Sequence, residues 1–302
     1  MAQEHIRKFT VGDVEIWRIV EVNAHQDPFA MLLQGGSPEL AKQYDWLFPH
    51  FATPEGEMKI SFQAFVMKAG GKRIMVDTCL GNDRPMPFPV FDHLQTSFLD
   101  DIASVGCPAE SIDIVLCTHL HFDHTGWNTR LVDGKWVPTF PNARYLFGKA
   151  EWEDLLAHLP DGGGHFVGHV PDAIMPVIDG GLVDFIGDNY RVTPEVTLFP
   201  TPGHTAGHVS VRIESAGEKG FITGDLMHHP IQCALPTTHG NFDVIKDLAG
   251  QSRVKFLKEA QGGESLVIGS HFCDPTAGYV MPDGPDSWRF ETERPQSPSK
   301  KS

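Results

Sequence analysis

Hydrophobic and polar residues alternate along much of the chain in short runs, and glycine, proline, asparagine or aspartate separates one run from the next. Runs of this length that are rich in β-branched and aromatic residues indicate β-strands bounded by turns. They predict strands at residues 14–22, 60–69, 73–77, 112–118, 196–199, 209–214, 221–223 and 266–269. Gly70 and Gly71 separate two of these strands and predict a hairpin, because glycine adopts the positive φ of a tight hairpin turn.

Helical periodicity appears between the strands, at residues 91–105, 149–158 and 243–260. In the last of these, Val244, Leu248, Val254 and Leu257 repeat at helical spacing over a mostly polar remainder. Strands that alternate with helices predict an α/β protein built in layers.

Residues 23–51, 82–89 and 160–176 are rich in glycine, proline and aromatic residues and predict long loops. Such loops shape a binding pocket or a subunit contact, or are simply surface connections. We interpret residues 1–290 as a single domain with an N-terminal extension over about residues 1–55. Residues 291–302 are too polar and too rich in proline to pack, and they predict a flexible tail.

The charge of the chain narrows the classes of partner. The 302 residues include 24 basic and 39 acidic side chains, for a net charge of −15. Such a surface repels phosphate backbones, so we do not expect nucleic acid as a substrate. The N-terminus carries charges where a signal peptide needs an apolar core, and no stretch reaches eighteen consecutive apolar residues. Five cysteines without a C-x-x-C pair favour reduced thiols, and we expect a cytoplasmic protein that does not enter membranes.

The segment CTHLHFDHTG, residues 117–126, places four potential metal ligands directly after a predicted strand: His119, His121, Asp123 and His124. In an extended segment His119 and His121 point the same way, because side chains alternate faces with a period of two. Clustered histidines repel one another when they are charged and need partners when they are neutral. A metal ion satisfies them, because it binds the neutral ring nitrogen.

Three further segments offer a histidine or an aspartate at the end of an apolar run or in a turn bounded by glycine: TPGHTAGH (201–208), ITGD (222–225) and VIGSH (267–271). With the first motif they give the pattern H-x-H-x-D-H, then His, then Asp, then His. In this order the pattern resembles, over residues 62–272, the metallo-β-lactamase superfamily. The resemblance implies a four-layer αβ/βα sandwich with metal ions at one edge of its two sheets.

The resemblance also implies a ligand for each position of a dinuclear site. His119, His121 and His204 would bind the first metal, Asp123, His124 and His271 the second, and Asp225 would bridge the two. These donors suit two divalent ions, with Zn²⁺ preferred and Fe, Mn or Co as alternatives. Such a pair activates a bridging hydroxide at neutral pH. Asp123 is the candidate catalytic residue that orients this nucleophile and passes a proton to the leaving group.

Other polar residues near these motifs allow more than one interpretation. His208 is interpreted as a residue that supports the ligands or the local structure. His228 and His229 either line the substrate pocket or lie in a solvated loop. Asp77 resembles the structural aspartate of the superfamily, which fixes the tautomer of a ligand histidine, and its alternative is an ordinary turn residue.

Within the superfamily, the long N-terminal segment and the stretches GDLMHHPIQ and GSHF are most similar to N-acyl homoserine lactonases and methyl parathion hydrolase-like enzymes. The resemblance therefore implies hydrolysis of a lactone, ester or organophosphate-like bond in a small molecule, and a homodimer. The alternatives are a glyoxalase II-like thioesterase or a sulfur dioxygenase, and, less favoured, a β-lactamase or a metal-binding protein without activity.

Overall fold

The computed structural model describes residues 5–27, 32–160 and 167–295. Within these ranges, seven strands form one sheet in the order β1-β2-β3-β4-β5-β8-β9, six form a second sheet in the order β10 to β15, and β6 pairs with β7. The first sheet consists of β1 (Ile6–Val11), β2 (Val14–Asp27), β3 (Met58–Ala69), β4 (Lys72–Val76), β5 (Ile114–Leu116), β8 (Arg144–Gly148) and β9 (Val183–Ile186). The second consists of β10 (Val196–Pro200), β11 (Val209–Ser215), β12 (Glu218–Ile222), β13 (Ser265–Ile268), β14 (Ala277–Pro282) and β15 (Trp288–Glu291). The separate pair is β6 (Thr129–Val132) with β7 (Lys135–Pro138).

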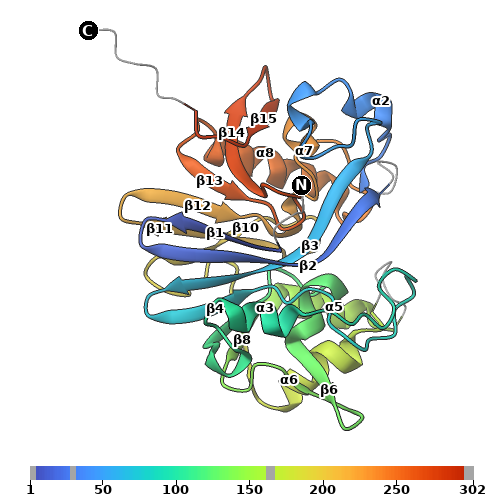
Figure 1. Cartoon of the computed structure of the whole chain (residues 1–302), viewed down its shortest axis with the longest axis vertical. Helices are drawn as coiled ribbons and strands as arrows, with labels where there is room; N and C mark the ends of the chain where they lie inside the picture. The colour runs from blue at the N-terminus through green and yellow to red at the C-terminus, as the bar shows by residue number, and fades with distance from the viewer. Residues whose placement is uncertain (1–4, 28–31, 161–166, 296–302) are drawn as a thin grey trace.

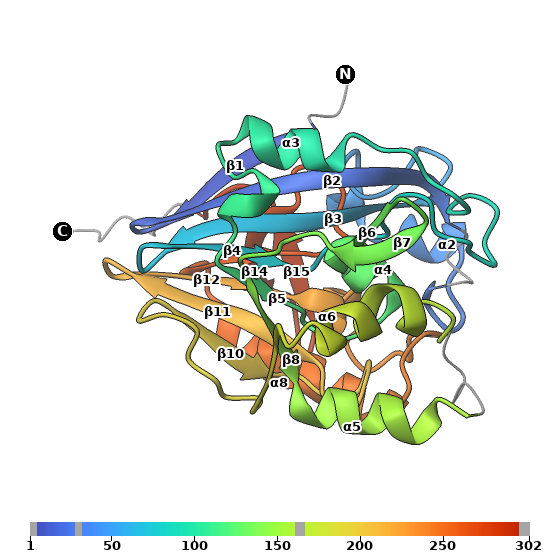
Figure 2. The ribbon, with the colours of Figure 1, turned by 90° about the horizontal axis from the view of Figure 1, so that it is seen from below.

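The helices lie on the outer faces of the two sheets. Figure 1 shows α3 (Phe98–Ser104), α5 (Lys149–His158) and α6 (Met175–Asp179) on one side of the strands and α8 (Lys246–Ala260) on the other, and Figure 2 gives the view at right angles. Shorter helices are α2 (Pro38–Ala41), α4 (Phe122–Thr125) and α7 (Ile231–Ala234). Helices, sheet, sheet and helices form four layers, as expected for the αβ/βα sandwich.

The period-two alternation along β3 shows why the sheets are buried on both faces. Phe65 and Met67 pack between the two sheets with residues such as Val211 of β11. Ala64 and Val66 point the other way, against α3. Side chains on alternate positions of a strand leave opposite faces of the sheet, so the part of β3 that lies between two layers, residues 64–67, is apolar on both faces.

Three predicted boundaries were wrong for identifiable reasons. The helix expected over residues 91–105 is restricted to α3, because His93 has a φ of 50° and the Asp92 carboxylate accepts a 2.8 Å hydrogen bond from the backbone N–H of Met86 in a turn. The helix expected from residue 243 begins at Lys246, because the Asp243 side chain instead accepts a hydrogen bond from Gly240 N. Within residues 160–176, Val170–Ile174 is helical rather than a loop, and residues 161–166 lie outside the described residues.

The N-terminal segment also differs from a plain loop. Strand β2 continues to Asp27, and Leu33, Leu47 and Phe51 are buried against the outer face of the second sheet. In the expected tail, Glu291 ends β15, and residues 296–302 lie outside the described residues. In the described part of the chain, no helix has the length and apolar character needed to cross a membrane.

Candidate functional site

The first sheet places one group of polar side chains at the end of β5. His119 follows this strand after two residues, and His121 precedes the short helix α4, which carries Asp123 and His124. Strands β4 and β5 are parallel, so their carboxyl ends meet at one edge of the sheet. His119 and His124 are 0% and 2% exposed, and the four side chains lie together, as the sequence predicted.

The second sheet places three more side chains at the ends of its strands. His204 lies in the turn between β10 and β11, Asp225 follows β12, and His271 follows β13. Strands β12 and β13 are parallel, so Asp225 and His271 leave the same edge of the sheet. The site therefore combines side chains from two sheets that are formed by separate parts of the sequence.

The ring nitrogens of these histidines face one another at short range. Nδ1 of His121 lies 3.0 Å from Nε2 of His119 and 3.0 Å from Nε2 of His204. On the other side, Nε2 of His271 lies 3.3 Å from Nε2 of His124. Nitrogens that converge in this way are arranged around common points, as the ligand atoms of a metal ion are.

Asp225 lies between the two groups and turns one oxygen to each. Its Oδ1 lies 3.1 Å from Nε2 of both His124 and His271. Its Oδ2 lies 3.4 Å from Nε2 of His204 and 3.8 Å from Nε2 of His119. Burial alone would raise the pKa of Asp225, but the histidines around it, His124 first, hold that pKa well below its ordinary value. The carboxylate is therefore ionised, and one of its oxygens faces each group of histidines.

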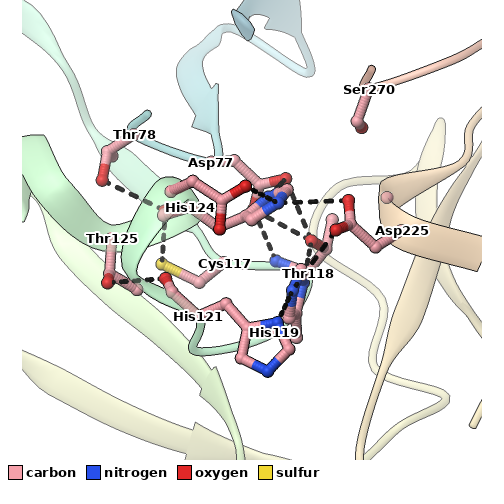
Figure 3. A network of polar contacts seen from close by, with 12 residues as sticks. Asp77, Thr78, Cys117, Thr118, His119, His121, His124, Thr125, Asp225 and Ser270 are labelled. Atoms are coloured by element: carbon pink, nitrogen blue, oxygen red, sulfur yellow. Dashed lines mark hydrogen bonds and ion pairs between the residues drawn. The ribbon is translucent and has the colours of Figure 1, made fainter. Parts of the chain in front are cut away.

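Three of the histidines are oriented by a contact at their ring nitrogen Nδ1. Nδ1 of His124 donates to Oδ2 of Asp77 at 2.9 Å, and Nδ1 of His271 donates to the carbonyl of Ser61 at 2.9 Å. Nδ1 of His204 lies 3.4 Å from Oδ1 of Asp243. Such contacts fix the tautomer and leave Nε2 free to bind a metal. Figure 3 shows His124 between Asp77 and Asp225.

Asp77 therefore has the supporting position that its sequence context indicated. It also accepts a 2.7 Å hydrogen bond from the backbone N–H of Thr118, which holds the segment that leads into His119. Asp243 was missed in the sequence, because it lies 39 residues from His204 and nothing in its own segment indicates a ligand nearby.

The remaining histidines have distinct positions. His208 is buried and accepts a hydrogen bond from the backbone of Asp225, so it supports the site. His228 and His229 are 6% and 1% exposed, so the solvated-loop interpretation is wrong for both. Nε2 of His228 lies 3.2 Å from Oδ2 of Asp225, whereas His229 contacts the carbonyl of Phe51 at 2.7 Å.

The donor set fits divalent metal ions. Three groups have one ligand atom per residue within 4.8 Å of the others. They are His119 with His121 and His204, Asp123 with His124, Asp225 and His271, and His204 with Asp225 and His228. Burial, followed by the charge of His124, keeps the pKa of His119 well below its ordinary value, so its ring is neutral, which is the form that binds metals. Oδ1 of Asp225 is buried between the Nε2 atoms of His124 and His271, as expected of an oxygen that a cation would contact.

Aromatic side chains form a wall on one side of the donors. The ring of Phe62 lies 5.2 Å from that of His271 and 4.8 Å from that of Phe91. Phe88 stacks at 5.6 Å on Phe122, which precedes Asp123, and is 38% exposed. The donors therefore adjoin an apolar surface that solvent reaches.

Comparison with known proteins identifies related chains. The model of the metallo-beta-lactamase superfamily matches residues 63–271. An N-acyl homoserine lactonase of a Bacillus species is 32% identical over 167 residues, which are 54% of this chain and 57% of that protein. N-acyl homoserine lactonase AttM of Agrobacterium fabrum is 31% identical over 202 residues, 64% of this chain and 70% of that protein. The chain thus spans little more than half the length of the first of these relatives.

Two solved structures share the fold. The hydrolase AbOPH of the beta lactamase superfamily is 21% identical, with a TM-score of 0.78 over 98% of this chain and 100% of that one. AidC, a dizinc quorum-quenching lactonase, is 22% identical, with a TM-score of 0.74 over 97% of this chain and 98% of that one. The family match covers more than half of the chain and includes the ends of β5, β10, β12 and β13, so this protein belongs to the metallo-beta-lactamase superfamily.

Proposed function

We propose that this protein is a dinuclear metal-dependent hydrolase that acts on a lactone, ester or organophosphate-like bond. Among these, we expect lactones to be the preferred substrates. The observation that carries the proposal is the position of Asp225, whose two oxygens face two separate groups of histidines. One ion would be held by His119, His121 and His204, the other by Asp123, His124 and His271, with Asp225 shared. Imidazole and carboxylate donors without thiolates favour Zn²⁺ in a catalytic site over a closed structural site.

Bound divalent ions would supply Lewis acidity and a water molecule of lowered pKa. The chain itself supplies position and proton transfer. Asp123 is 12% exposed at its side chain, and within the described residues its Oδ2 lies 3.6 Å from Nε2 of His124 and 3.5 Å from Nε2 of His271. Both contacts use Oδ2, so Oδ1 is the oxygen in position to accept a proton and return it to the leaving group.

The surroundings of the donors support an uncharged, partly apolar substrate. Phe62, Phe88 and Phe91 offer an apolar wall beside His271, and the net charge of −15 disfavours anionic substrates. The relatives named N-acyl homoserine lactonase and the product-bound AidC support a lactone with an apolar chain. The cytoplasmic location and the homodimer stay predictions.

The test is a measurement of metal content joined to a substrate screen. Protein purified without added metal is analysed for its elements, and hydrolysis of lactones, aryl esters, thioesters, phosphotriesters and β-lactams is followed before and after chelation. We expect about two divalent ions per chain and lactone or ester turnover that chelation abolishes and Zn²⁺ restores. Turnover confined to thioesters, or one iron without hydrolysis, would contradict the proposal, and so would a chain without metal.

A further inference from the structure

Glu151 is a buried carboxylate in the first turn of α5, behind the candidate metal centre. It is 5% exposed, although it belongs to a helix that lies on the surface of the molecule (Figure 2). Its Oε1 accepts a hydrogen bond from the backbone N–H of Leu120 at 3.1 Å, and its Oε2 accepts one from the backbone N–H of Gly207 at 3.0 Å. A single side chain therefore joins two segments that are far apart in the sequence.

These two amides belong to the two segments that carry the histidines of the first group. Leu120 lies between His119 and His121, at the end of the first sheet. Gly207 lies three residues after His204, in the turn of the second sheet. Glu151 thus connects, through backbone hydrogen bonds, the three histidines whose nitrogens lie 3.0 Å apart across the two sheets.

The packing around this connection leaves no space for adjustment. A Cβ atom at position 207 would lie 2.3 Å from the backbone nitrogen of Glu151, so only glycine allows α5 to approach the turn this closely. The helix and the histidine-bearing turn are therefore in direct backbone contact. A change at the Glu151 carboxylate cannot be absorbed by a movement of the turn toward the helix.

The charge of Glu151 is costly in this position. Within the described residues it forms no salt bridge, and burial raises the pKa of its carboxyl. The hydrogen bonds that it accepts, from the Thr205 side chain first and then from the backbone of Leu120 and Gly207, act in the opposite direction. A buried carboxylate without a cation is favourable only where hydrogen bonds satisfy it. The backbone N–H groups of Leu120 and Gly207 cannot rotate away, so each of them requires an acceptor. The two carboxylate oxygens of Glu151 supply one acceptor each.

The second group of donors is held by other contacts. The backbone N–H of Thr78 donates to the carbonyl of His124 at 2.8 Å, and Asp77 holds the ring of that residue. His271 is held by the carbonyl of Ser61. The contacts of Glu151 therefore serve one half of the centre and not the other.

We propose that Glu151 is a positioning residue that sets the distance between His204 and the His119–His121 pair, and thereby the affinity of the first metal position. The inference rests on the proposed dinuclear centre. It adds that the metal affinity of the first position depends on Glu151, whereas that of the second does not.

The experiment is metal titration of Glu151→Gln. Glutamine keeps the shape of glutamate, but its NH₂ group faces one of the two backbone N–H donors, so one of the two segments is released. The metal-free variant and the metal-free native protein are titrated with Co²⁺, and the visible absorption and the competition with a chelator are followed. The matched control is Glu153→Gln, which removes the same charge from an exposed position of the same helix, where the side chain is 64% exposed.

We expect the native protein and Glu153→Gln to bind two Co²⁺ ions, and Glu151→Gln to retain one while the other binds about 10–100-fold more weakly with an altered spectrum. A second variant, Gly207→Ala, displaces the same turn from α5 and is expected to weaken the same ion. Urea unfolding of the metal-free proteins separates lost stability from lost affinity. If metal-free Glu151→Gln does not fold, the same comparison is made by the rate at which the zinc-loaded variants lose each ion to a chelator.

Equal affinities and unchanged spectra in Glu151→Gln would overturn the inference, as would an equal weakening of both ions. A native protein that binds no metal would instead contradict the proposed function, so the two failures are distinguishable.

Discussion

The backbone N–H of Asp225 donates a 2.8 Å hydrogen bond to Nε2 of His208. The other ring nitrogen, Nδ1, lies 3.1 Å from the carbonyl of Thr201, to which it donates. Burial lowers the pKa of His208 to about 3, so the ring is neutral at pH 7 and Nε2 carries the lone pair that this contact needs. His208 thus fixes the residue that faces both groups of histidines.

His208→Leu is expected to weaken metal binding about 10–100-fold, because a supporting contact of a ligand is lost. It also leaves the buried N–H of Asp225 without an acceptor, at a cost of about 1–3 kcal/mol in stability. Chelator competition and urea unfolding measure the two effects. His239→Leu, at a side chain that is 36% exposed, is the control, and equal metal affinity in both variants would show that His208 only fills space.

Asp123→Asn tests the role of Asp123 in proton transfer. Asparagine keeps an oxygen that can contact a metal ion but cannot take up a proton, so we expect kcat to fall about 10²–10⁴-fold while the metal content is unchanged. The rate of hydrolysis of a lactone substrate gives kcat, and elemental analysis gives the metal content. Asp100→Asn, at an exposed position of α3, serves as the control. Turnover within a few fold of the native rate would leave Asp123 as a ligand alone.

His229 gives the stability of the protein a specific dependence on pH. Burial lowers the pKa of His229 to about 4 in the folded protein, against about 6.5 in the unfolded chain. Between these values the unfolded chain binds the additional proton, so the folded state loses stability as the pH falls from 6.5 toward 4. The loss between pH 7 and pH 5 amounts to about 2 kcal/mol.

The measurement is urea unfolding of the metal-free protein at both pH values. His229→Gln, which does not titrate, should lose less stability over this interval by that amount. If the native protein and the variant show parallel pH profiles, the folded pKa of His229 is not depressed.

Phe51→Ala tests whether the N-terminal segment belongs to the core of its own chain. The side chain is 0% exposed, and its ring lies 5.7 Å from that of Phe290 and 6.2 Å from that of Phe272. Removal of a buried phenylalanine costs about 3–5 kcal/mol, whereas Val90→Ala, at a side chain that is 65% exposed, should cost less than about 0.5 kcal/mol. A loss of stability that varies with protein concentration would instead place Phe51 in a subunit contact.

The sequence predicted the elements whose own residues carry a clear period. The buried strand β3 and the helix α5 were found because every second residue or every third to fourth residue is apolar. Strand β8 was missed because its apolar run, Tyr145 to Phe147, is very short and only Gly148 separates it from α5. The helix expected over residues 91–105 begins only at Phe98, because side-chain hydrogen bonding at Asp92 decided the backbone before it.

The candidate ligands were predicted for a similar reason, since each lies at the end of an apolar run or in a glycine-bounded turn of its own segment. Their supporting residues were harder to find, because their partners are close only in space. Glu151 lies 31 residues from Leu120 and 56 from Gly207. No local pattern encodes such a pairing, and only the meeting of the two sheets reveals it.

The division of the donors between two sheets links metal uptake to the docking of two parts of one chain. Residues before Ile186 supply His119, His121, Asp123 and His124, and residues after Val196 supply His204, Asp225 and His271. An ion held by both sets binds the docked state and not the separated state, so each tenfold excess over its dissociation constant adds about 1.4 kcal/mol to the docked form. By the same linkage, a substitution in the interface between the sheets that weakens docking also weakens metal binding, even when it lies far from the metal ligands. The affinity for metal is therefore a property of the whole sandwich.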